Sequence, residues 1–185
     1  AALVGPEGHV WAFEPNPLPR QTLEKNMKGA PQVTIHHEAL AAEPVESRDF
    51  FVPREDVPNQ GLGGLAHNST QPTEKVTVRI ETIDRVIGES PVSLIKLDVQ
   101  GFEHEVIAGA KRVVARDLPH VLFESMPTER SGREVAKMLR DFGYSLWRVD
   151  DLTRHPYFSL EPAGTLDVSS NYLAMPPPRS RAKSI

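Results

Sequence analysis

Short apolar runs alternate with segments of helical spacing along most of this chain, and this alternation constrains the fold more than any other feature. Residues 9–14 (HVWAFE), 92–99 (VSLIKLDV) and 120–124 (HVLFE) have the length and composition of buried strands. Apolar residues at helical spacing follow two of these runs, in residues 102–116 and 131–142. Such strand-helix-strand units build a mainly parallel sheet covered by helices, so the sequence predicts an α/β fold.

Local signals place further elements. Asn16 is a good N-cap and Pro17 suits the first helical position, so a helix is expected directly after the first strand. Ser131 and Glu134 have the spacing of a capping box at the start of the last helix. Residues 33–36 are predicted as the next strand.

Two final strands are expected at residues 144–149 and 170–175, with a proline-bearing loop between them. Because that connection has no helical pattern, we expect these strands to form an antiparallel pair at the edge of an otherwise mostly parallel sheet.

The middle of the chain differs in character. Residues 48–52 and 75–83 read as strands, and a glycine-rich stretch at 59–64 (NQGLGG) lies between them. Its spacing and context match neither a P-loop nor a dinucleotide fingerprint. We expect residues 59–67 to be a flexible connection, with a mobile lid over a ligand as the functional alternative.

Composition limits the class of protein. The chain has 185 residues, which suits one α/β domain, and its 39% apolar and 25% charged residues are ordinary for a globular protein. The formal charge of −4 gives no basis for a nucleic-acid partner. The sequence has no apolar run of membrane-spanning length and no signal-peptide pattern, so we expect a cytoplasmic protein without a membrane partner.

Metal chemistry is not expected either. The absence of cysteine excludes disulfides and thiolate metal sites, and the seven histidines show no metal-binding spacing. One domain is expected over residues 1–175, followed by a disordered basic tail at 176–185. The sequence leaves the oligomeric state open, a homo-oligomer included.

Carboxylates follow successive predicted strands. Ligands of open α/β sheets bind at the carboxyl ends of the strands, where the acidic residues here are Glu14, Glu38, Asp98 and Glu124. A carboxylate at such an end can accept hydrogen bonds from both hydroxyls of a ribose. Each one could instead cap a helix or lie in a solvated turn, but together they predict a ligand that contains a nucleoside.

The most specific stretch is residues 96–103 (KLDVQGFE). Asp98 ends a buried strand, and Gly101 permits a tight turn or a close approach of the backbone. Glu103 is expected in the first turn of the following helix, where its charge is favourable with the helix dipole by roughly 0.3–1 kcal/mol.

These motifs carry a resemblance. Residues 10–17 (VWAFEPNP) look like the second-strand signature of the FkbM family of methyltransferases. Residues 95–103 (IKLDVQGFE) resemble that family's motif I-K-[IL]-D-[VI]-E-G-x-E, with Gln100 in place of the commoner Glu. Residues 119–124 and 171–174 also match in order and spacing. The resemblance implies a Rossmann-like class I methyltransferase fold.

The resemblance has one large gap. Members of the family begin with a strand and a glycine-rich loop of the form D-x-G-A-N-x-G, and this chain has no such sequence. In the family that strand is central, between the strands that end here at Glu14 and Asp98. We therefore expect an N-terminally incomplete domain with unpaired backbone groups at this point.

The resemblance also implies a function, the transfer of a methyl group from S-adenosyl-L-methionine to a hydroxyl of a small molecule or sugar. The residues implied for the cofactor are Glu14, Pro15 and Asn16 near the ribose, Glu38 and Ala39 near the adenine, and Asp98. Asp98 is also the candidate for positioning the acceptor or taking its proton.

Gly101, Glu103 and Glu124 are expected to support the site. Two alternatives remain open at this stage. One is a nicotinamide-dependent oxidoreductase, since Glu14 would serve its ribose equally well, and the other is a non-catalytic, truncated α/β domain.

Overall fold

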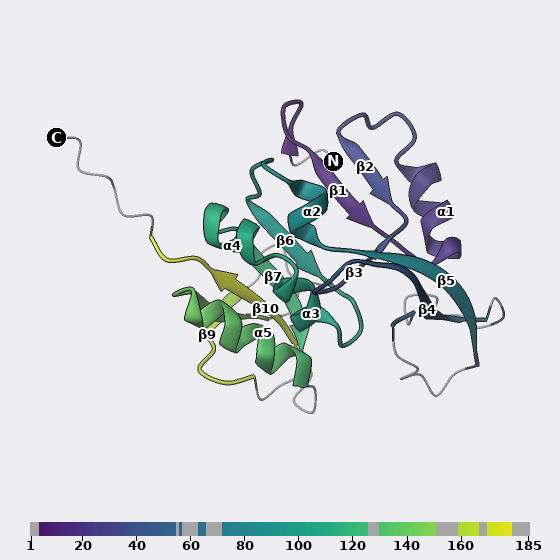
Figure 1. The fold of residues 1–185 in the computed structure, drawn as a ribbon. Coiled ribbons are helices and arrows are strands. Elements are labelled where there is room, and N and C mark those ends of the chain that lie inside the picture. Colours follow the sequence, from purple (N-terminus) through teal and green to yellow (C-terminus); the bar gives the residue numbers. More distant parts are fainter. Residues whose placement is uncertain are drawn as a thin grey trace.

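The computed structural model describes residues 4–54, 56, 63–65, 72–125, 130–150, 159–166 and 170–178. Its strands are β1 (Val10–Phe13), β2 (Val33–His36), β3 (Ala39–Leu40), β4 (Val45–Pro53), β5 (Thr73–Glu81), β6 (Leu94–Leu97), β7 (His120–Ser125), β8 (Ser145–Asp150), β9 (Ser159–Pro162) and β10 (Ser170–Met175). Its helices are α1 (Pro17–Asn26), α2 (Ile83–Ile87), α3 (Glu103–Ala108), α4 (Lys111–Asp117) and α5 (Arg130–Asp141). The predicted α/β class is confirmed (Figure 1).

The strands described here form three sheets rather than one. β1 pairs in parallel with β2, β3-β5-β4 form a mixed sheet, and the largest sheet has the order β6-β7-β10-β8-β9. Within the largest sheet only β6 and β7 are parallel, and the other pairs are antiparallel. The prediction of a mostly parallel sheet is therefore wrong, because β4, β8, β9 and β10 all join through antiparallel pairs.

The antiparallel pair of β8 and β10 is confirmed, but its predicted place at the sheet edge is wrong. β10 lies between β7 and β8, with Leu173 opposite both Leu122 and Trp147. The edge is instead β9, which falls in the segment predicted as a loop. Pro162 ends this strand, and a proline at an edge costs no ladder hydrogen bond on the open side.

The helices follow their local signals with two exceptions. Asn16 caps α1 through its side-chain oxygen, which accepts from the Leu18 N–H at 3.2 Å, as predicted. The single helix predicted over residues 102–116 is divided into α3 and α4 at Gly109, where a Cβ would lie 2.2 Å from the Ala41 carbonyl oxygen. The Ala41 backbone, directly after β3, occupies that space, so the close approach at this junction of α3 and α4 requires a glycine.

The predicted capping box is also wrong. Ser131 lies inside α5, which begins at Arg130, and its hydroxyl donates to the Glu103 carboxylate at 2.7 Å instead of capping the helix. This contact joins two elements 28 residues apart, so local spacing alone could not reveal it.

The main core lies between the five-stranded sheet and the helices α3, α4 and α5 (Figure 1). Side chains with no exposed surface come from all of these elements, among them Val106, Val113, Val121, Phe123 and Leu139. A second, smaller cluster around Phe50, Val78 and Ile80 holds the β3-β5-β4 sheet together. None of the helices described is long and apolar enough to cross a membrane.

β1 and β6 face each other across a gap. Figure 1 shows both strands running in the same direction, and neither pairs with the other in the part of the chain described. The space between them has a volume of about 320 Å³ and is lined mainly by apolar side chains, from β1 by Val10, Trp11 and Phe13 and from β6 by Leu94, Ile95 and Lys96. The family resemblance implied unpaired backbone groups at this point, and among the described residues β1 and β6 are each an edge strand of its own sheet.

The prediction of a tail at 176–185 falls mostly outside the described residues, since the structure describes only Pro176 to Pro178 of it.

Candidate functional site

The carboxyl ends of β1 and β6 meet at one pocket. Glu14 follows β1, Asp98 follows β6, and both line a small cavity of about 100 Å³. Ala39 and Leu40 of β3 and Val99 and Phe102 of the turn after β6 also line it. Two carboxylates 84 residues apart in the chain therefore share one cleft, as the acidic strand ends predicted.

Glu14 is held by its own turn. Its Oε1 accepts from the Asn16 N–H at 2.9 Å, while its second carboxylate oxygen accepts no hydrogen bond from the described residues. Burial raises the pKa of Glu14, and the Asn16 N–H and the Arg20 guanidinium oppose this rise. Arg20 also donates to the Pro15 carbonyl at 3.2 Å, which fixes the turn between β1 and α1. Glu14 lines the pocket, and within the described part of the chain its second carboxylate oxygen remains available as an acceptor.

Asp98 is oriented by its neighbours. Lys96 Nζ lies 3.0 Å from one of its carboxylate oxygens, and Gln100 donates to the other at 3.3 Å. The Asp98 side chain is 50% exposed, so it can be reached from solvent. Neither Lys96 nor Gln100 was among the predicted site residues, although Lys96 lies two residues before Asp98 and so on the same face of the strand.

The structure brings together five of the predicted residues and separates the others. Those that line the pocket are Glu14, Pro15, Asn16, Ala39 and Asp98. Asn16 is buried and serves as a helix cap, which gives it a structural role in addition.

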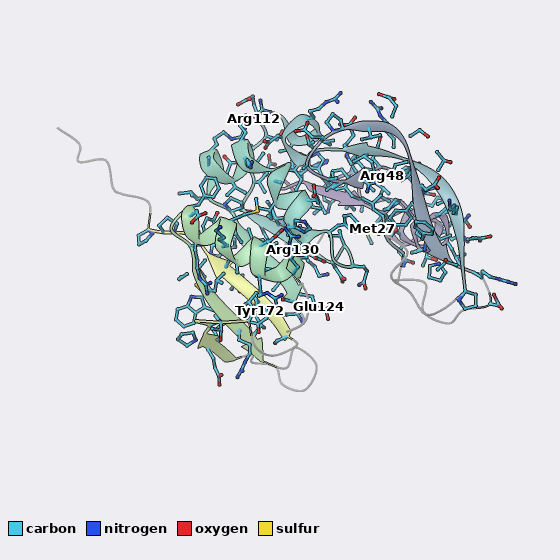
Figure 2. The ribbon with its side chains drawn as sticks, turned by 60° about the horizontal axis from the view of Figure 1, so that its bottom comes forward. Met27, Arg48, Arg112, Glu124, Arg130 and Tyr172 are labelled. Atoms are coloured by element: carbon cyan, nitrogen blue, oxygen red, sulfur yellow. The ribbon has the colours of Figure 1, made fainter. Side chains whose placement is uncertain are left out.

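Glu38 does not line the pocket, and its carboxylate instead lies 3.7 Å from His36 Nδ1. Glu124 is also outside it. Figure 2 shows Glu124 on the side of β10, well apart from Met27 and Arg48, and its residue pair across the ladder is Asn171. Glu124 belongs to β7, which is the neighbour of β6 in the sheet and therefore lies one strand further from β1 than Asp98 does. The rule about strand ends failed for Glu124 for this reason.

Gly101 and Glu103 lie behind the pocket wall rather than in it. Gly101 has a φ of 94°, the left-handed conformation that favours glycine, as the prediction of a tight turn required. Glu103 does open α3, as predicted, but its carboxylate is buried and turns back into the preceding turn.

An apolar wall of the pocket was missed by sequence reasoning. Phe50 from β4 and Phe102 line it together with Gly63 and Leu65. A Cβ on Gly63 would lie 2.9 Å from the Phe50 ring, so glycine is needed for this close approach. The glycine-rich stretch was the signal, but its sequence did not show what it would pack against.

Part of the predicted connection at 59–67 can now be placed. Residues 63–65 run along β4, where the Gly64 N–H donates to the Phe51 carbonyl at 2.9 Å and the Phe51 N–H donates in return. Residues 59–62, 66 and 67 lie outside the described residues, so the choice between connection and lid stays a prediction.

The described residues offer no metal site, since no group of three or more potential ligands comes together among them.

Comparison with known proteins adds two findings. The family model described as the methyltransferase FkbM domain matches residues 1–146. The crystal structure of Methyltransferase FkbM from Methylobacillus flagellatus KT is similar with a TM-score of 0.54 and 16% identity, over 90% of this chain. The chain covers 36% of that protein's chain. At this identity the likeness supports the fold alone. No curated protein matches the chain.

Proposed function

Because the chain belongs to the FkbM methyltransferase family, we propose that it binds S-adenosyl-L-methionine at the pocket between Glu14 and Asp98 and methylates a hydroxyl of a small molecule or sugar. The observation that carries this proposal is the shared pocket at the carboxyl ends of two strands that run in parallel. The family assignment does not favour a nicotinamide-dependent oxidoreductase.

The chemistry of the pocket fits this cofactor. The second carboxylate oxygen of Glu14, which has no partner among the described residues, suits a ribose diol. The apolar side chains of Leu40, Phe50 and Leu65 suit the faces of an adenine ring. The Ala39 backbone lies on the same wall and is the proposed adenine contact, whereas Glu38 points elsewhere and is proposed only as support for this turn.

The pocket alone is small for a whole cofactor, because ligand sites usually have about 300–1,000 Å³. Phe13 and Leu40 line both this pocket and the space between β1 and β6, so the two cavities are neighbours. We propose that the binding site extends from the pocket toward this gap.

The gap itself is proposed to take one further parallel strand. Val10 and Glu14 donate to Gln32 and His36 on the β2 side, so the intervening Trp11 and Phe13 direct their backbone groups toward the gap. Ser93 accepts from His120 on the β7 side, so Leu94 and Lys96 direct theirs toward the gap from β6. A strand there would join the two sheets into one Rossmann-like class I sheet.

The reaction asks little of the protein beyond positioning. When bound, S-adenosyl-L-methionine supplies an activated methyl group, and holding two reactants in line can contribute roughly 7–11 kcal/mol. Asp98 lies at the open side of the pocket, where its carboxylate can orient an acceptor hydroxyl and take its proton. Lys96 and Gln100 hold that carboxylate in place.

Calorimetry with S-adenosylhomocysteine tests the proposal, with NAD⁺ as the comparison ligand. Glu14→Gln should weaken S-adenosylhomocysteine binding roughly 10- to 100-fold, since hydrogen bonds to a charged group contribute about 1.5–3 kcal/mol. Glu124→Gln is the matched control, with the same change at a strand end outside the pocket, and should stay within about twofold of the unsubstituted chain.

Asp98→Asn should also leave S-adenosylhomocysteine affinity within about twofold while it lowers methyl transfer roughly 100-fold or more, the usual scale of acid–base catalysis. Equal losses of affinity in the Glu14 and Glu124 variants, or tighter binding of NAD⁺, would contradict the assignment.

A further inference from the structure

The turn between β6 and α3 forms one wall of the pocket and has an unusual backbone. Gln100 has a φ of 52° and Gly101 a φ of 94°, so two consecutive residues are left-handed. For Gln100, a residue with a Cβ, this conformation is unfavourable. Val99 and Phe102 on either side line the pocket together with Asp98. The shape of the pocket therefore depends on a turn whose unfavourable backbone conformation needs stabilising contacts from other side chains.

Glu103 stabilises the turn through hydrogen bonds to its backbone. The residue is 3% exposed, and its Oε1 accepts from the Val99 N–H and the Gly101 N–H, each at 3.2 Å. Successive backbone N–H groups in such a turn form a concave site for an anion, and here the protein's own carboxylate fills it. A buried carboxylate is costly unless its oxygens are all bonded, so the second oxygen also needs a donor.

Ser131 of α5 is that donor. Its hydroxyl donates to Glu103 Oε2 at 2.7 Å and accepts from the His104 N–H at 3.2 Å, and it lies 3.0 Å from His104 Nδ1. Ser131 is 4% exposed. This hydroxyl is thus committed to α3 and is not available as a nucleophile facing solvent.

The main core fixes where Ser131 lies. The next residue, Gly132, packs so closely on β7 that a Cβ would come within 2.0 Å of Ser125 Oγ. Val135 and Leu139, further along α5, have no exposed surface. Because this packing fixes the position of α5, the Ser131 hydroxyl is held in place, and its hydrogen bond keeps the Glu103 carboxylate against the turn.

We infer that Ser131 and Glu103 are positioning residues, which together hold the Asp98–Phe102 turn in the shape that forms the pocket wall. Glu103 acts on the turn directly, and Ser131 acts through Glu103. The effect on ligand affinity rests on the proposed function, whereas the effect on the turn does not.

Ser131→Ala tests this inference, with Ser125→Ala as the matched control. Ser125 is a buried serine in the same contact between β7 and α5. Amide hydrogen exchange of Val99 and Gly101 is measured by NMR for both variants, and S-adenosylhomocysteine affinity by calorimetry. In Ser131→Ala these two amides should exchange at least about tenfold faster and the affinity should fall roughly three- to tenfold, since the loosened wall no longer fits the ligand. In Ser125→Ala both quantities should stay within about twofold of the unsubstituted chain.

Glu103→Gln provides a second variant in case Ser131→Ala does not fold. Glutamine keeps an oxygen for the two amides but removes the negative charge, and hydrogen bonds to a neutral acceptor are weaker, so the same amides should again exchange faster. Unchanged exchange at Val99 and Gly101 in either folded variant overturns the inference. Faster exchange with unchanged affinity also overturns it, since the pair would then be merely structural. If the unsubstituted chain does not bind S-adenosylhomocysteine, the proposed function fails, but the exchange rates still decide whether the pair holds the turn.

Discussion

The chain contains two strand-helix-strand units that differ sharply in burial. In the unit from β6 to β7, side chains such as Val106, Val113 and Phe123 have no exposed surface. In the unit from β1 to β2, Asn16 is the only buried residue among residues 4–36, and α1 contains none. Both have parallel strands and both were recognised from the same sequence pattern.

The difference comes from the neighbours of each unit. β7 has β10 on its second edge and α5 against its face, so its side chains are enclosed from several directions. Among the described strands β1 pairs with β2 alone, and its other edge borders the gap. The pattern of apolar residues thus predicts which element forms, while the elements around it decide how much that element contributes to stability.

The largest effect should come from removing an aromatic ring in each unit. Phe123→Ala removes a fully buried ring that stacks on Tyr172, and should lower the free energy of unfolding by about 3–5 kcal/mol. Phe13→Ala removes a partly buried ring stacked on His36, and should cost less than about half as much. Urea unfolding of both variants measures the difference. Equal losses in the free energy of unfolding would show that the two units are equally well packed.

Amide exchange should sharpen the comparison strand by strand. Trp11, Phe13 and Lys96 direct their N–H groups toward the gap, whereas Ala12 and Ile95 direct theirs toward a paired strand. We expect the first group to exchange roughly 10- to 100-fold faster, because no ladder bond must open first. A ligand or added peptide strand that filled the gap should slow these amides selectively. Equal rates in the two groups would mean that the edges are already paired in solution.

Much of the fold could be predicted because its signals are local. Asn16 and Pro17 define the start of α1, and the strand runs at 33–36 and 120–124 are short, apolar and bounded. The order of strands could not be predicted in the same way. β10 enters between β7 and β8 through contacts between residues far apart in the chain, and the β9 edge strand has a proline that resembles a loop signal.

The same division applies to the site. Glu14 and Asp98 could be found because each follows a short apolar run that forms a strand, and parallel strands bring such ends together. Phe50 and Leu65 could not, since they reach the pocket from the β4 side, where no local pattern marks a ligand contact. Ser131 was misread as a cap because its partner, Glu103, lies in another helix.

Tyr144, whose hydroxyl contacts the chain directly before β7, gives a smaller test next to the well-buried unit. Its hydroxyl donates to the Pro119 carbonyl at 2.8 Å, and burial raises the pKa of Tyr144 to about 12. Tyr144→Phe should lower the free energy of unfolding by about 0.5–1.5 kcal/mol. The native state keeps this proton at a pH where the unfolded chain has lost it, so stability should fall as pH rises from about 10 toward about 12.

Chemical unfolding of the unsubstituted chain and of Tyr144→Phe across that pH range checks the prediction. The part of the decline due to Tyr144 should be absent in the variant, which has no phenol to titrate. Parallel curves for the two proteins would assign the decline to other groups.

Glu14, which follows β1 in the less buried unit, gives the smallest and most diagnostic test. Burial raises its pKa, so the native state binds its proton more readily than the unfolded chain does. Its contribution to stability is therefore fully present below the ordinary pKa of 4.5 and is lost as pH rises through the raised value. Glu14→Gln should stabilise the chain slightly at pH 7, by less than about 1 kcal/mol, because the amide oxygen can still accept from the Asn16 N–H. At pH 4 the advantage should vanish.

A carboxylate kept for structure would give the opposite result, a loss of stability at pH 7 on substitution, and that outcome in urea unfolding would remove Glu14 from the proposed ligand site. A small gain in stability together with weaker S-adenosylhomocysteine binding would show instead that this partly buried charge is retained for the ligand rather than for the fold.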